Sequence, residues 1–330
     1  MPNTVLASRY NNLRNQVNLV LGSSSIASPT FGYGQGFSTN SKIGTRSVAD
    51  PATAETVSAQ DYEDLYIDLI RAKAHQESAS AVAVDPFITG DFNTNGASTD
   101  KIEEAYIINL ESLATNLQTN KFLAAATNLT IENNSAASSS RVGQLPFSSE
   151  IDHIFTMTWP TAVQRRHYFN AGGQIRFAAS VAYTGSQAKT VDWQQTLAAM
   201  GTTSFTATAT TNNSGVGNNS AIGNYDLTNS YQLVYRQDNG AVYSNSSYNI
   251  YAMEHTTSDD TSAIRFKVRF FDGRPNNISY GIDELAYGNF YSTIQIAYAD
   301  STVSINGTSH NAVVIPAASH PTATIQRPLS

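Results

Sequence analysis

The chain has 330 residues and a mass of 35.5 kDa, with 19 Lys and Arg against 26 Asp and Glu, so its formal charge is −7. Charged residues make up 14% of the chain, against about 25% in an ordinary soluble protein, whereas apolar residues make up 41%. The chain can therefore form a buried core, and its acidic balance argues against a broad nucleic-acid-binding surface. Because it has no cysteine, disulfides, thiolate nucleophiles and cysteine-type zinc sites are excluded.

The N-terminus shows no basic segment followed by a long apolar one, so we expect no signal peptide. No apolar run approaches the roughly 18 residues that cross a membrane. We therefore expect a protein that is made in a cytoplasm and contacts no membrane.

The first part of the chain has the periodicity of helices joined by polar loops. Tyr10, Leu13, Val17 and Leu21 recur at steps of three and four residues, as on one face of a helix. Because each predicted helix has a single apolar face, we expect all of them to pack on the rest of the chain or on other subunits. Two further helices, from Ser58 and after Thr99, share this spacing through Tyr62, Leu65, Leu69 and Ala72, and through Ile102, Tyr106, Leu110, Leu113 and Leu117.

Beyond a polar stretch rich in Asn, Ser and Ala, the apolar period changes to two, which predicts strands. Asp238-Asn239-Gly240 is a hairpin-turn signal, and a helical insert is expected over 193–200. The clearest strand, 264–270, is apolar on one face and cationic on the other. The other predicted strands include Ile151 to Trp159, Ile175 to Val181, Phe205 to Ala209, Tyr231 to Tyr235, Tyr248 to Ala252 and Ile294 to Tyr298.

These patterns predict an α+β chain in which an N-terminal helical region is followed by a C-terminal antiparallel β-sandwich, jelly-roll-like in type. The predicted bounds are 1–126 for a helical docking and oligomerisation domain, 127–146 for a polar linker, 147–311 for the β-sandwich and 312–330 for an extended C-terminal tail. Prolines block regular structure in the tail, which we expect to tie subunits together.

No motif in the chain indicates catalysis or a cofactor. The six histidines lack metal-ligand spacing beside a carboxylate, so we expect no metal. The neighbouring carboxylates Asp259-Asp260 and Asp283-Glu284 point opposite ways in extended chain, which favours turn residues over a glycosidase pair. Gly32, Gly34 and Gly36 lack the setting of a phosphate loop. Tyr33 between them is interpreted as an anchor on a partner surface, or as part of a flexible loop.

The segment 165–177 combines charge, aromatic side chains and a glycine pair in a predicted turn-to-strand transition. Gly172-Gly173 permits a positive φ before a strand, and Tyr168 and Phe169 are predicted to fold under the sheet. Arg166 and its neighbours interleave basic and aromatic residues, as single-strand nucleic-acid sites do. Because the basic run is short and the chain is acidic, we expect no nucleic-acid partner.

The same segment, Arg166-His167-Tyr168-Phe169-Asn170-Ala171-Gly172-Gly173-Gln174-Ile175-Arg176-Phe177, resembles a signature of virion structural proteins of tailed phages, particularly myoviruses of marine cyanobacteria. The resemblance implies a structural protein associated with the tail or neck, without catalytic residues to carry over. Further similar stretches are Tyr10 to Leu13, Gly32 to Gln35, Arg71 to Gln76, Trp193 to Gly201, Tyr225 to Thr228 and Tyr231-Gln232.

We therefore expect a non-enzymatic virion component, a tail, neck or fibre-attachment protein that forms a trimer or hexamer and contacts other tail, neck or baseplate proteins. The alternative is a lectin-like module of a tail fibre, in which tyrosines of the aromatic-rich stretch 243–251 stack on a host surface glycan. The residues predicted to be structural or to lie at an interface are Tyr10, Leu13, Tyr33, Tyr62, Leu65, Arg166, Tyr168, Phe169, Gly172 and Gly173.

Overall fold

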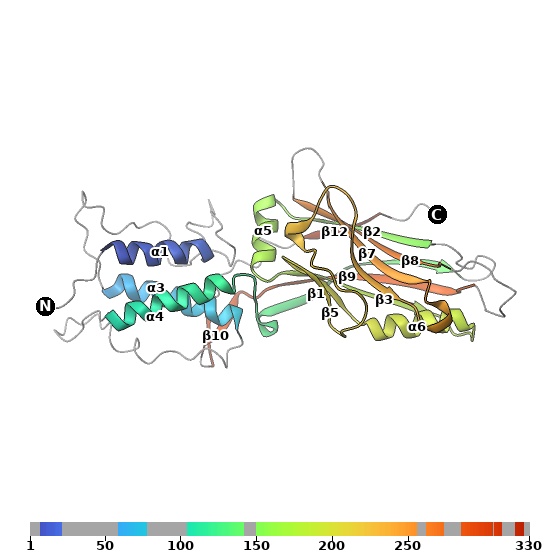
Figure 1. Ribbon diagram of the computed structural model, residues 1–330, viewed down its shortest axis with the longest axis horizontal. Helices are drawn as coiled ribbons and strands as arrows, with labels where there is room; N and C mark the ends of the chain where they lie inside the picture. The colour runs from blue at the N-terminus through green and yellow to red at the C-terminus, as the bar shows by residue number, and fades with distance from the viewer. Residues whose placement is uncertain are drawn as a thin grey trace. The chain divides into compact units, whose positions relative to one another are not determined.

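A computed structural model of the chain shows a mixed α+β protein with antiparallel sheets (Figure 1). The structure describes residues 7–21, 59–77, 104–141, 150–255, 262–273, 285–305, 307–311 and 321–326.

The chain divides into two compact units, each built from segments that are far apart in the sequence. The predicted division into contiguous domains is therefore wrong in its boundaries, because late segments complete the first unit. The helical unit comprises 1–130, 166–172 and 298–319, and the sheet unit comprises 131–165, 173–297 and 320–330.

In the helical unit, α1 (Ala7–Leu21), α3 (Ala59–Gln76) and α4 (Glu104–Thr119) lie side by side (Figure 1). The helical periodicity is confirmed, because the predicted faces of α3 and α4 lie in one shared core. Ser58 and Ile102 lie outside the described residues. The core residues on these three helices include Tyr10, Leu13, Tyr62, Leu65, Leu69, Ala72, Ile107, Leu110, Ala114 and Leu117.

A β-hairpin from late in the chain completes this helical core. Strands β10 (Thr302–Ile305) and β11 (Thr308–Asn311) pair antiparallel, with Gly307 at a φ of 78° in the turn. Val303 and Ile305 join the core cluster of the helices. Assigning 302–311 to the sandwich domain is therefore wrong, because these apolar side chains cover the helices.

Within the described residues the sheet unit contains two five-stranded sheets. We call them the β9 sheet and the β8 sheet, after a long strand in each. The β9 sheet has the order β1 (Leu129–Arg141), β9 (Gly288–Ala299), β3 (Gln174–Ala182), β4 (Thr203–Phe205) and β5 (Thr210–Asn212). The β8 sheet has the order β12 (Thr322–Gln326), β2 (Glu150–Thr158), β8 (Ala263–Phe271), β7 (Ser247–His255) and β6 (Gln232–Asp238).

Aromatic side chains of the two sheets contact one another. Phe266 of β8 lies 5.0 Å from Phe177 of β3 and 5.1 Å from Phe205 of β4, measured between ring centroids. Phe270 of β8 lies 5.2 Å from Phe290 of β9. The apolar side chains of the two sheets thus point toward one another and share one core. The alternation along β8 places its apolar residues on this side.

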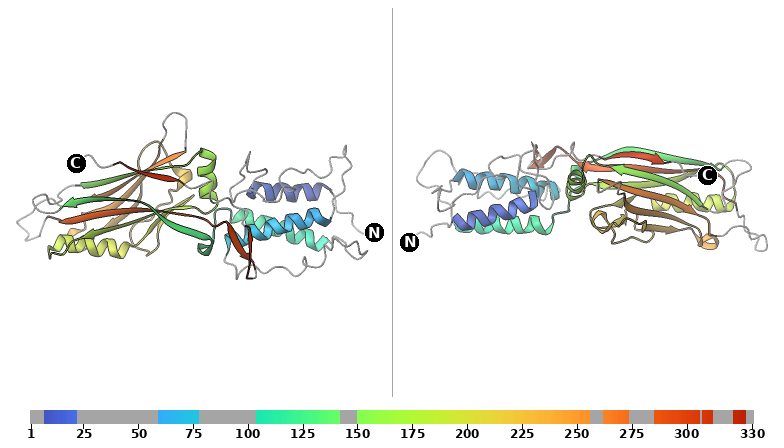
Figure 2. Two further views of the ribbon diagram at one scale, coloured as in Figure 1. Left: turned by 180° about the vertical axis from the view of Figure 1, so that it is seen from behind. Right: turned by 90° about the horizontal axis from the view of Figure 1, so that it is seen from above.

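The predicted helical insert is confirmed as α6 (Ala188–Met200). Its Trp193 contacts the rings of Phe270 and Phe290, at 5.8 and 6.0 Å between centroids, so one helix residue contacts both sheets. In Figure 2 the helix runs alongside the strands of the sheet unit.

Three segments differ from the prediction. Residues 129–141, predicted as part of a linker, form the edge strand β1, because backbone pairing with β9 rather than side-chain propensity defines the strand. The tail prediction missed β12, which pairs with β2. Residues 162–170 form the helix α5 (Ala162–Asn170), where a turn leading to a strand was expected.

The alternation predicted for 231–235 is interrupted in β6. A β-bulge between Leu233 and Tyr235 shifts the register against β7. As a result Val234 and Tyr235 are both buried, whereas Leu233 is 41% exposed. The predicted hairpin is confirmed as the antiparallel pair β6–β7, and η4 (Ala241–Tyr243) lies in its loop.

Candidate functional site

The outer face of the β8 sheet, which points away from the shared core, gathers cationic and aromatic side chains. Along β8, buried apolar residues alternate with the partly exposed Arg265, Lys267 and Arg269. The register places Tyr251 opposite Lys267. The cationic face predicted for this strand is confirmed. We call Tyr231, Tyr251, Arg265, Lys267 and Arg269 together the cationic face.

Lys267 lies against two tyrosine rings at the centre of this face. Its Nζ is 4.7 Å from the ring centroid of Tyr231 and 4.6 Å from that of Tyr251, within cation–π range. Partial burial, followed by the charge of Arg269, lowers the pKa of Lys267. The pKa of Tyr231 is raised, mainly by burial. The ammonium therefore already occupies a face of each ring.

Arg269 is fixed by carboxylates of the neighbouring strand. Its Nε and Nη2 donate to the two carboxylate oxygens of Asp152, each at 2.7 Å, and its Nη1 lies 2.8 Å from Glu150. Asp152 stands directly opposite Arg269 in the β2–β8 register. These bonds, Asp152 first, raise the pKa of Arg269. The guanidinium is held in one orientation by a bidentate pair, which gives the face a defined shape.

Arg265 meets a neutral histidine at the other end of the face. Its Nη2 lies 3.1 Å from Nε2 of His255, and because a guanidinium can only donate, Nε2 accepts. Partial burial and the charge of Arg265 lower the pKa of His255. The pair therefore leaves the positive charge on the arginine alone.

The same outer face also exposes apolar side chains. Leu233 stands opposite Tyr251 in the β6–β7 register and is 41% exposed, and Phe271 at the end of β8 is 38% exposed. Aromatic, arginine and apolar side chains together are typical of protein–protein interfaces.

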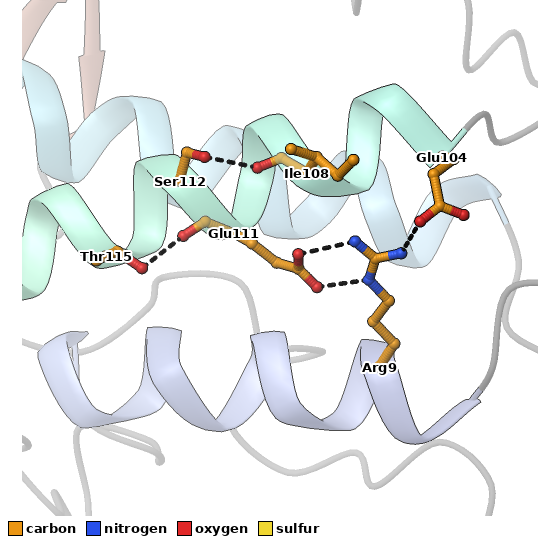
Figure 3. A network of polar contacts seen from close by, with 6 residues as sticks. All are labelled: Arg9, Glu104, Ile108, Glu111, Ser112 and Thr115. Carbon is orange, nitrogen blue, oxygen red and sulfur yellow. Dashed lines mark hydrogen bonds and ion pairs between the residues drawn. The ribbon is translucent and has the colours of Figure 1, made fainter.

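The helical unit has its own polar network, which joins α1 to α4 (Figure 3). Arg9 forms a bidentate pair with Glu111, with Nε–Oε1 at 2.7 Å and Nη2–Oε2 at 2.9 Å, and also donates to Glu104. The hydrogen bond from Arg9 lowers the pKa of the Glu111 carboxyl. Because the groups are partly exposed, this network orients the helices more than it stabilises them.

Buried polar side chains close the C-terminal end of α3. The amide of Asn128 donates to the carbonyl of Ala74 at 2.7 Å and to that of His75 at 3.1 Å. His75 is fully buried, and its Nε2 donates to the carbonyl of Ala171 at 2.9 Å, which fixes the tautomer. Burial lowers the pKa of His75, so the ring is neutral. These bonds satisfy carbonyls that a helix end leaves without partners.

The residues predicted to be structural or to lie at an interface occupy different environments in the structure. Tyr33 lies outside the described residues. Arg166 is exposed, whereas its neighbour Arg165 is buried and bonds Asn224 and Glu254, each at 2.8 Å. The four predicted helix residues all lie in the core of the helical unit, namely Tyr10, Leu13, Tyr62 and Leu65.

The glycine pair of the signature segment acts as predicted at one position. Gly172 follows α5 with a φ of 83°, and a Cβ there would lie 2.3 Å from that of Ala124, so only glycine fits. Gly173 is buried and does not have a positive φ. Tyr168 and Phe169 are buried, with their rings edge to face at 5.2 Å. They belong to the helical unit, so their predicted position under the sheet is not confirmed.

A buried ion pair in the sheet unit was not predicted from the sequence. Nζ of Lys189 in α6 lies 2.5 Å from Oδ2 of Asp272, and both side chains are 0% exposed. Ser246 donates to the other carboxylate oxygen at 3.1 Å. Nothing in the local patterns of residues 189 and 272 indicates this contact, which depends on the packing of α6 against the end of β8.

Among the described residues, no group of three or more His, Asp or Glu side chains is placed to hold a metal ion. In the same part of the chain, no helix is long and apolar enough to span a membrane. Comparison of the chain with protein-family models, curated proteins and solved structures finds no match.

Proposed function

We propose that this chain is a non-enzymatic structural component of a bacteriophage virion, in the tail, neck or fibre attachment. The proposal is supported by the resemblance of residues 166–177 to a signature of phage structural proteins. The observation that carries it is the cationic face, which offers side chains suited to protein contact in place of a catalytic constellation.

We infer further that the two sheets form a β-sandwich of jelly-roll type. The contacts of Phe266 with Phe177 and Phe205 support face-to-face packing of the sheets. The strand order of the β8 sheet, in which β12 lies beside β2, also supports Greek-key-like connections. In the proposed virion, the cationic face would lie on the outside of this sandwich.

The partners in this proposal are other virion proteins and further copies of the chain, as a trimer or hexamer. The chain is acidic overall, with a charge of −7, whereas Arg265 and Lys267 are positive groups on the cationic face and Arg269 is paired with Asp152 and Glu150. Charge complementarity between this face and an acidic surface would orient subunits as they associate. The proposed location is the virion.

The deciding experiment is quantitative mass spectrometry of purified particles of the phage that encodes the chain. The copy number of the chain is measured against the major capsid protein. A fixed count in multiples of three or six is the expected result, because symmetric tail and neck assemblies repeat their subunits. Absence of the chain from the particle would overturn the proposal.

A lectin-like module of a tail fibre remains the second candidate. The structure changes its residues: Tyr243 and Tyr248 are buried, whereas Tyr251 lies on the cationic face. Sugar stacking would therefore use Tyr251, the last residue of the stretch 243–251, together with Tyr231. A glycan array compares the wild type with Tyr251→Ala and with Tyr291→Ala, a partly exposed tyrosine on β9. Binding lost only in the first variant would favour the lectin function.

A further inference from the structure

Lys189 and Asp272 are placed for a reaction with each other. Their Nζ and Oδ2 atoms are 2.5 Å apart, and neither side chain has any exposed surface. A buried ion pair often adds little to the stability of the fold, because desolvation of the two charges offsets their attraction. The close approach therefore calls for another explanation.

The position of Lys189 in its helix is also unfavourable for a positive charge. It lies in the first turn of α6, where the helix dipole disfavours a positive charge. A lysine whose nitrogen has become part of an amide carries no charge. The site would thus be relieved of both the dipole repulsion and the desolvation of an ammonium.

Asp272 is held from several directions. Ser246 donates to its Oδ1 at 3.1 Å, which leaves Oδ2 facing Lys189. The next residue, Gly273, packs so closely that a Cβ there would lie 2.1 Å from the carbonyl oxygen of Asn245. The backbone beside the carboxylate is therefore fixed, and the reacting atoms remain adjacent.

The neighbouring side chains are aromatic. Trp193 lies one turn after Lys189, Phe270 lies two residues before Asp272, and their rings are 5.8 Å apart. Phe290 and Tyr248 also contact Phe270, at 5.2 and 5.4 Å. An amide formed among such groups is shielded from the water that would hydrolyse it.

We propose that Lys189 and Asp272 condense into an intramolecular amide, an isopeptide bond. A proton passes from the ammonium to Oδ2, and the neutral Nζ attacks the carboxyl carbon while Ser246 holds Oδ1. A second proton passes from Nζ to Oδ2, which leaves as water. One C–N bond forms and one C–O bond breaks, and no oxidant, reductant or other reactant is needed. Fixed proximity replaces the activation that amide formation in solution requires.

The bond would serve a chain that cannot form disulfides, since it has no cysteine. It would close a covalent loop over residues 190–271, which include most of α6 and the strands β4 to β8. Such a cross-link restricts the unfolded chain, as a disulfide does, and is insensitive to redox conditions. The inference does not depend on the proposed virion role.

The test is the intact mass of the purified full chain under denaturing conditions. We expect a mass lower than the sequence mass by one water molecule. A tryptic digest should contain one branched peptide that joins Lys189 to Asp272, with no cleavage after Lys189. A wild-type chain of full sequence mass, without the branched peptide, would overturn the proposal.

One side reaction also releases a water molecule and must be distinguished from amide formation. Asp272-Gly273 can cyclise to a succinimide, which does not involve Lys189. Lys189→Arg abolishes the amide and leaves the succinimide route open. Recovery of the full sequence mass in this variant supports the proposal, and a persistent loss of water overturns it. Lys73→Arg, at the partly exposed pair Lys73–Glu77, is the matched control and should keep the mass deficit.

Two further results keep the test decisive. In Asp272→Asn, condensation releases ammonia instead of water, so its branched Lys189 peptide should have the same mass as the wild-type one, whereas a succinimide at residues 272–273 would leave the peptide linear. If Lys189→Arg does not fold, the wild-type digest decides alone. The branched peptide then supports the bond, and a linear Asp272 peptide contradicts it.

Discussion

In the helical unit, the buried side chains of His75 and Asn128 donate to backbone carbonyls, whereas in the sheet unit the buried Lys189 and Arg165 pair with carboxylates. The difference follows from the charge of the buried groups. A helix end leaves carbonyls without partners, and a neutral donor satisfies them. Lys189 and Arg165 also lie on helices, α6 and α5, but as buried cations they each need an acidic side chain. Neutral donors thus satisfy a helix end in the helical unit, and carboxylates compensate these two buried cations in the sheet unit.

The largest effect is expected for Phe266→Ala in the sheet unit. Phe266 contacts Phe177 and Phe205, so its removal leaves a cavity between the two sheets. We expect a loss of about 3–5 kcal/mol in the free energy of unfolding, measured in urea. Phe271→Ala is the matched control on the same strand, because Phe271 is 38% exposed, and should cost far less.

Hydrogen exchange by mass spectrometry would locate the effect of Phe266→Ala. Peptides of β3 and β8 should exchange faster, and those of α3 should be unchanged. Equal losses of protection in both units would contradict the view that each unit is stabilised by its own core, because the stability of the helices would then also depend on Phe266.

A smaller loss is expected for Asn128→Ala in the helical unit. The change leaves the buried carbonyls of Ala74 and His75 without the side-chain donor at the end of α3. Losing such bonds costs about 1–3 kcal/mol, measured by denaturant unfolding. Asn116→Ala, at an exposed position of α4, is the control. Equal stability of the two variants would show that Asn128 does not close the helix.

The pH dependence of the helical unit should follow His75. Burial lowers its pKa, against the opposing effects of the hydrogen bond to Ala171 and of the charge of Asp300. Below a pH of about 6.5 the unfolded chain therefore binds a proton that the folded chain does not. Stability is therefore present above about pH 6.5 and lost as the pH falls towards the folded-state pKa, by at most about 1.4 kcal/mol per pH unit.

Urea unfolding between pH 7.5 and 5 measures this slope, and His75→Gln should flatten it while keeping a donor for Ala171. His255→Gln should change it less, because that side chain is only partly buried. A slope unchanged by His75→Gln would contradict the assignment.

The smallest effect is expected at the cationic face. Lys267→Met removes the ammonium from between Tyr231 and Tyr251 and keeps the apolar stem. We expect a loss of about 0.5–1 kcal/mol, because the site is partly exposed. Lys121→Met, at the longer contact of 5.4 Å with the ring of Phe122, should cost less. If Lys267→Met weakens self-association more than stability, the face acts in assembly, as proposed.

Several elements could be predicted because their pattern is local. The spacing of Tyr62, Leu65 and Leu69 follows the helical repeat, and α3 buries all three. The alternation in β8 likewise predicted which side chains face the core and which form the cationic face. Gly172 could be predicted at a turn because glycine tolerates a positive φ.

Other elements could not be predicted from local pattern. The polar sequence of β1 has weak strand propensity, and pairing with the distant β9 defines it. The bulge in β6 leaves Leu233 exposed and Tyr235 buried, although the alternation predicted both on one face of the strand. The pair Lys189–Asp272 was missed for a similar reason, since its members are 83 residues apart and each is common in solvent-exposed positions.

The sequence by itself determined the periodic elements, the absence of disulfides and the cationic side of β8, because these depend on residue type and on spacing within one element. Only the tertiary structure decided which segments complete each unit and which polar groups meet in the core. Val303 and Ile305 cover helices that all end by Thr119, and Asn128 closes a helix that ended at Gln76. Such contacts arise from packing between distant segments, where the burial of a side chain depends on the neighbours that the fold supplies.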